Sequence, residues 1–241
     1  MLQKPSSYSV AGTAAAPAVL QDTQARVLNQ VYTWMSLGLA LTGAVGYYAS
    51  ATEAVRSFIF SNGLVMIVLV VAQLGIVFGL SAAVSRLSGA AATGLFFLYS
   101  ALTGLTFSAI FMIYTTASIA STFFVTAGTF MVMAMFGHTT KRDLTKFGSI
   151  AFMGLIGIII AAVVNMFMQN SLLDLLISAV GVLLFTGLTA YDAQRIKEMA
   201  AKVTNGESEA KVAVMGALAL YLDFINLFLM LLRFLGVSRN D

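Results

Sequence analysis

Long stretches without a charged residue recur through this sequence, and they constrain the fold more than any other feature. The longest separates Arg86 from Lys141. About 20 mainly apolar residues cross the ~30 Å hydrocarbon core of a bilayer as a helix. The stretches are apolar throughout rather than at every second residue, which favours helices over the strands of a membrane barrel.

The composition agrees with residence in a lipid bilayer. The chain is 59% hydrophobic and 10% charged, whereas soluble domains carry roughly a quarter charged residues. Seven membrane-spanning helices are predicted. The stretch between Arg86 and Lys141 holds two of them, and the polar residues 114–118 form the turn between these two. The other five lie within 27–52, 57–85, 147–173, 172–196 and 212–232. The predicted fold is an all-α, polytopic seven-transmembrane-helix bundle.

Two domains are expected. Residues 1–25 are rich in Ser, Ala, Gln and Thr and have no apolar segment, so they are predicted to form a disordered tail; residues 26–241 form the helical domain. The start of the chain lacks the basic residues followed by an apolar stretch that a cleavable signal needs. Both prolines, Pro5 and Pro17, lie in the tail. The absence of cysteine excludes disulfides, thiolate metal sites and a cysteine nucleophile.

The distribution of Lys and Arg predicts the orientation, because short cytoplasmic loops are enriched in both. A cytoplasmic N-terminus places ten of the thirteen on the inside and leaves Arg56, Arg233 and Arg239 outside. A bacterial inner (plasma) membrane location with the N-terminus in the cytoplasm is therefore expected. Arg233 and Arg239 fit this topology least well, and a re-entrant last helix would return them to the cytoplasm.

Asp192 and Asp223 are the candidate functional residues, because carboxylates at membrane depth are costly and usually functional. If the sixth helix reaches about Met199, Asp192 lies ~10 Å inside its end, and if the seventh begins near Met215, Asp223 lies ~12 Å inside. The two carboxyl groups can then face each other. Supporting polar residues on the same helix faces are Asn226, three residues after Asp223, and Thr189, three residues before Asp192.

Such a pair has specific chemistry. Two unit charges ~4 Å apart at an effective dielectric near 20 repel by ~4 kcal/mol, so one shared proton is favoured. Loss of that proton leaves a negative, oxygen-lined site suited to calcium. Two structural alternatives stand beside this hypothesis: Asp192 forms an ion pair with Arg195 on its own helix, and Asp223 serves only as a hydrogen-bonding group between helices.

Three segments resemble the signature motifs of one family: FTGLTAYDAQRIKEM, ALALYLDFINLFLMLLRF and AMFGHTTKRDLTKFGS. They are similar to those of the Bax inhibitor-1 (TMBIM or YccA-like) membrane proteins, and the resemblance extends from about residue 28 to the C-terminus. It implies a seven-helix bundle whose last helix is surrounded by the others, and in bacterial relatives a pH-sensitive calcium leak. The family's paired aspartates correspond to Asp192 and Asp223. Arg86 is the nearest counterpart of an arginine that latches the pair in some relatives, although its register differs.

Two other functional classes are consistent with parts of the sequence. An intramembrane aspartic protease also uses two aspartates, but its Gly-x-Gly before the second aspartate and its Pro-Ala-Leu motif are absent, so the chain is not expected to be an enzyme. The resemblance also implies an alternative without transport, a regulatory protein that binds a membrane protease or a stress or cell-death partner.

The remaining features are predicted to be structural. His138, the only histidine, is expected to be a solvated interfacial residue, and Ser171 with Asp174 to form a helix-capping box. No nucleotide or zinc motif is present. No cofactor is expected beyond calcium as a transported ion, and no nucleic-acid partner.

Overall fold

A computed structural model describes residues 15–203 and 206–239 of the chain. This part folds into eight helices and no sheet, apart from an isolated bridge between Tyr114 and Ser238. The helices are α1 (Ala15–Ala51), α2 (Glu53–Phe60), α3 (Gly63–Ala83), α4 (Gly89–Ile113), α5 (Thr116–Thr139), α6 (Thr145–Met168), α7 (Ser171–Ala200) and α8 (Gly206–Leu235).

The predicted seven-helix bundle is confirmed. Among the described residues, the six helices from α3 to α8 are long and apolar enough to cross a membrane. The seventh predicted span corresponds to α1, a helix of 37 residues that is less apolar. The short α2, which was not predicted, joins α1 to α3. The predicted turn lies between Ile113 and Thr116, where the Thr115 hydroxyl accepts a hydrogen bond from the Ser118 N–H and caps α5.

Helix α1 begins earlier than the sequence predicted. It starts at Ala15, inside the segment 1–25 that was expected to be a disordered tail; residues 1–14 lie outside the described part. Alanine, leucine and glutamine have high helix propensity. Pro17 lies in the first turn, where its missing N–H has no helical partner to lose. Asp22 and Arg26, one turn apart, add an ion pair.

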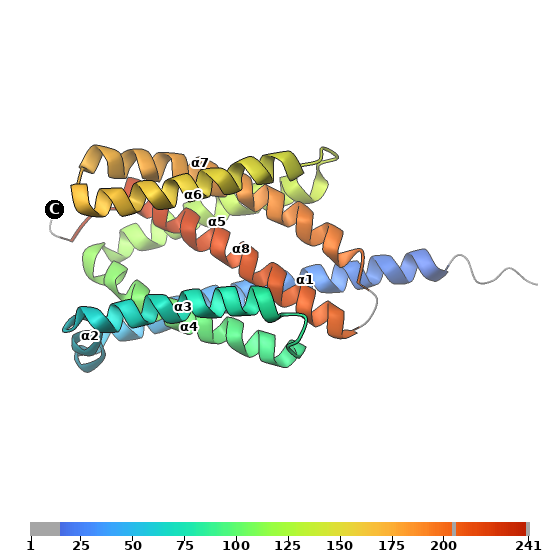
Figure 1. Ribbon diagram of the computed structural model, residues 1–241, viewed down its shortest axis with the longest axis horizontal. Helices are drawn as coiled ribbons and strands as arrows, with labels where there is room; N and C mark the ends of the chain where they lie inside the picture. The colour runs from blue at the N-terminus through green and yellow to red at the C-terminus, as the bar shows by residue number, and fades with distance from the viewer. Residues whose placement is uncertain (1–14, 204–205, 240–241) are drawn as a thin grey trace, which may run out of the picture.

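Helix α8 lies at the centre of the bundle. In Figure 1 it runs diagonally between a group formed by α1, α3 and α4 and a group formed by α5, α6 and α7. It contacts α1, α4, α5 and α7. Within the apolar 18-residue segment of α8, 67% is buried inside the protein, against 6–33% for the corresponding segments of the other candidate membrane-spanning helices. The expectation that the last helix is surrounded by the others is confirmed, and the lipid-facing surface belongs mainly to the outer helices.

Polar contacts hold α8 against α1 and α4. Tyr221 is fully buried, and its hydroxyl lies 2.6 Å from the Thr42 hydroxyl of α1. Thr42 also donates to the carbonyl of Ser100 on α4. The Tyr221 ring packs edge-on against Phe96 and Tyr99, both from α4. These contacts fix the position of α8 only two residues before Asp223.

The end of α8 is fastened to the starts of α5 and α7. Arg233 pairs with Asp174 in the first turn of α7 at 3.0 Å, and the Arg239 guanidinium donates to the carbonyl of Tyr114. The predicted capping box is wrong, because Asn170 caps α7 by accepting from the Leu173 N–H. The re-entrant alternative is also wrong, since α8 is one continuous helix of 30 residues that ends beside the start of α7.

Candidate functional site

Asp192 on α7 and Asp223 on α8 meet where the two helices pack together. Their carboxyl groups lie within hydrogen-bonding distance of each other. Two carboxylate anions have no proton to donate, so this contact is a hydrogen bond only when the pair holds a proton. Helix α7 ends at Ala200, close to the predicted Met199. Helix α8 begins nine residues before the predicted Met215, so Asp223 lies farther from the N-terminal end of its helix than expected.

The two carboxyl groups differ in their access to water. Asp223 is only 4% exposed, and its Oδ2 is buried without a hydrogen-bond partner among the described residues. Asp192 is half-buried and lines a cavity of about 300 Å³ between the ends of α3, α7 and α8. Asp192 therefore faces the cavity, while Asp223 lies behind it.

Two cations line the same cavity, Arg195 and Lys211. Arg195 attracts Asp192 electrostatically. The structural alternative for Asp192 requires an ion pair between these two residues, and none is found among the described residues. Lys211 pairs with Glu207 at 2.8 Å and donates to the carbonyl of Ser85 at 3.1 Å. The sequence did not point to Lys211, because its proximity to α7 depends on how α8 crosses the bundle.

In the described part of the chain, no hydrogen bond joins the predicted supporting residues to either carboxyl group. Asn226 donates to the carbonyl of Leu222, and Thr189 to that of Phe185, each within its own helix. Arg86 is exposed in the loop after α3 and does not line the cavity. The functional roles of Asn226, Thr189 and Arg86 stay predictions.

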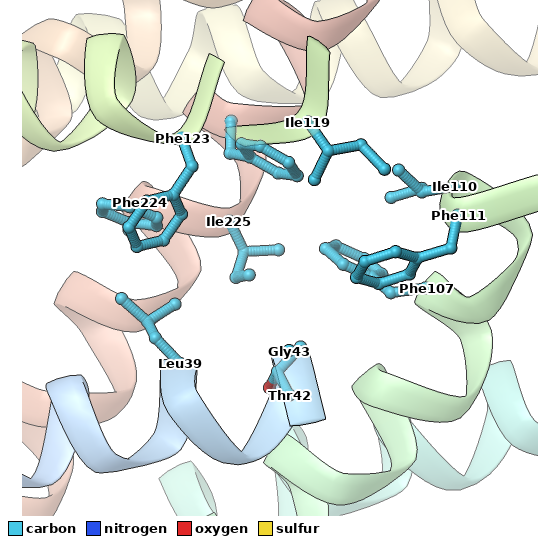
Figure 2. A pocket seen from close by; sticks show the side chains of 11 residues that line it. Leu39, Thr42, Gly43, Phe107, Ile110, Phe111, Ile119, Phe123, Phe224 and Ile225 are labelled. Carbon is cyan, nitrogen blue, oxygen red and sulfur yellow. The ribbon is translucent and has the colours of Figure 1, made fainter. Parts of the chain in front are cut away.

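An apolar chamber of about 90 Å³ lies beyond the pair, toward the α4–α5 turn. Figure 2 shows side chains from α1, α4, α5 and α8 pointing into it, with Phe107, Phe123 and Phe224 among them. Thr42 supplies the only polar side chain among the described residues of this lining. The lining includes Phe224 and Ile225, the two residues that follow Asp223, but none of the described residues of α7.

His138 was predicted to be a solvated residue, but it is only partly exposed to water. Its side chain is half-buried, and Nδ1 is buried without a partner among the described residues. The ring lies 6.3 Å from that of Tyr32 on α1, and the Lys197 ammonium donates to the His138 carbonyl at 2.7 Å. Contacts with Tyr32 and with α7 therefore cover part of His138. The described residues contain no group of three or more His, Cys, Asp or Glu that could hold a metal ion.

The sequence is similar to one family and to several bacterial proteins. The model of the family described as "Inhibitor of apoptosis-promoting Bax1" matches residues 24–240. The Escherichia coli K12 "Inner membrane protein YbhL" is 51% identical over 88% of this chain and 92% of its own length. An uncharacterized Borreliella burgdorferi protein is 51% identical over 90% of this chain and 94% of its own length. These descriptions name no enzymatic activity, and they confirm the family resemblance indicated by the three motifs.

Proposed function

This chain belongs to the Bax inhibitor-1 family, and from that premise we propose that it is a pH-sensitive calcium leak controlled by Asp192 and Asp223. The observation that carries the proposal is the contact between the two carboxyl groups at the inner end of a cavity. A pair that holds one proton carries one negative charge, and loss of the proton doubles it. The attraction for a divalent cation therefore depends on pH.

The surroundings of the pair support a gated path. The cavity extends from the loop end of α7 and α8 to Asp192, and the apolar chamber lies beside α8 at the residues that follow Asp223. A hydrated cation does not cross such a chamber without movement of its walls. Calcium is the transported ion in this proposal, since two carboxylates supply fewer oxygens than the 6–8 ligands that a resident calcium site requires.

Calcium flux into proteoliposomes tests the function. The wild-type protein is expected to admit calcium at a rate that changes severalfold between two pH values, whereas the double variant Asp192→Asn, Asp223→Asn gives the same rate at both. Flux no greater than in protein-free liposomes would reject the leak. An unchanged pH response in the double variant would reject the switch. A variant lacking residues 1–14, which precede α1, should keep its flux; a regulatory protein whose N-terminal segment binds a partner would lose that interaction instead.

We also propose a bacterial inner-membrane location with a cytoplasmic N-terminus. One relative is described as an inner membrane protein. Contacts of Lys197 with His138, Lys211 with Ser85 and Arg26 with Glu209 bring the basic segments to one end of the bundle, which the positive-inside rule assigns to the cytoplasm.

Cysteine labelling tests this orientation, because the natural chain has no cysteine. A membrane-impermeant maleimide is expected to label Ser61→Cys in intact spheroplasts, since Ser61 precedes α3 at the end opposite the basic loops. Lys141→Cys, in the loop after α5, should be labelled only after the membrane is permeabilised. The reverse pattern would invert the topology.

A further inference from the structure

A second, larger apolar groove lies between α1 and α5. It has a volume of about 550 Å³ and is lined by residues that include Met35, Leu39, Phe130 and Ala134, with Phe224 of α8 at its base. Helices α1 and α5 each contact α8. This volume falls within the roughly 300–1,000 Å³ of typical ligand pockets.

The groove opens toward the side of the bundle. Met131 and Met135 on its α5 edge are each 62% exposed. Its lining extends along α5 from Phe123 to Thr139, a length of ~24 Å at 1.5 Å per residue. One leaflet contributes about half of the ~30 Å hydrocarbon core. The groove is therefore long enough to accept an extended hydrocarbon chain from one leaflet.

One end of the groove is polar and basic. His138 lines this end, and its Nδ1 is buried without a partner among the described residues. Lys141 and Arg142 follow directly after α5; both are exposed, and neither forms an ion pair within the described part of the chain. Asp143 is the acidic residue of this loop, and it accepts a hydrogen bond from the Thr145 N–H.

We propose that this groove binds one acyl chain of an anionic phospholipid from the leaflet at the basic end. The chain would lie against Phe130 and Phe224, and the phosphate would lie near Lys141 and Arg142, because basic residues at a membrane surface attract anionic headgroups. The bound acyl chain would contact Phe224, the residue after Asp223. The lipid site does not depend on the proposed calcium transport.

Retention of lipid through purification tests the proposal. The full-length protein is reconstituted into vesicles with equal amounts of phosphatidylglycerol and phosphatidylcholine, extracted in detergent and examined by native mass spectrometry. We expect one retained phospholipid per chain, with phosphatidylglycerol preferred severalfold. Ala127→Phe, which adds a ring to the groove lining, should abolish retention. Gly128→Phe is the matched control, because its added Cβ meets open space and the residue lies outside the lining.

A second pair of variants separates headgroup recognition from folding. Lys141→Gln with Arg142→Gln should remove the preference for phosphatidylglycerol, whereas Lys146→Gln, at the start of α6, should keep it. Equal retention of both lipids by the wild-type protein would overturn the proposal, as would unchanged retention in Ala127→Phe. A lipid-free dimer would show that a second copy covers the groove instead, and would also overturn it.

Discussion

Asp223→Asn is expected to make the stability of the protein insensitive to alkaline pH and to abolish the pH response of calcium flux. In the proposed switch, loss of the shared proton leaves the half-buried Asp192 carboxylate in contact with the buried Asp223 carboxylate. Their repulsion is ~4 kcal/mol at 4 Å and an effective dielectric near 20. The folded state then binds more protons than the unfolded state, so the free energy of unfolding falls as pH rises. The asparagine variant has no second charge and should not show this fall.

Thermal unfolding across a pH series measures this effect, with Trp34 as the single tryptophan reporter. Asp174→Asn is the control, because it removes another carboxylate from α7 that is 45% exposed and paired with Arg233. Loss of such a surface pair should cost at most ~1 kcal/mol and leave the pH dependence intact. A purely structural Asp223 would give the opposite result, with Asp223→Asn less stable than the wild-type protein at every pH.

Gly137→Ala is expected to prevent correct packing of α5 against α7. A Cβ at this position would overlap the backbone carbonyl of Ala190, which lies two residues before Asp192. The backbone of one helix would have to move, and overpacking typically costs about 1–3 kcal/mol or more. The variant should yield little monodisperse protein, and any folded fraction should have a displaced Asp192.

Gly128→Ala, on the same helix, is the matched control. No atom lies within 4 Å of its added Cβ, and replacing a helical glycine by alanine stabilises by up to about 1 kcal/mol. Fluorescence-detected size-exclusion chromatography and thermal unfolding compare the two variants. Equal yields and equal stability would show that the α5–α7 approach tolerates a methyl group.

Local patterns in the sequence were sufficient for the membrane fold. The polar residues 114–118 predicted the turn between α4 and α5, because hydroxyl side chains cap helices and interrupt apolar runs. The run of apolar residues around Asp223 predicted its burial. The capping box at Ser171 was wrong because Asn170 competes for the same N–H groups, and Asp174 is used instead by Arg233 from a distant helix.

The sequence by itself determined the class of protein, the number of long helices and the two aspartates, because the cost of placing charge in hydrocarbon is a property of each residue and its neighbours in the chain. Only the tertiary structure decided that Asp223 is the more buried carboxyl group, that Arg195 and Lys211 rather than Arg86 line the cavity, and that His138 borders an apolar groove. These relations depend on helix crossing angles and close approaches such as Gly137 to Ala190, which join residues far apart in sequence.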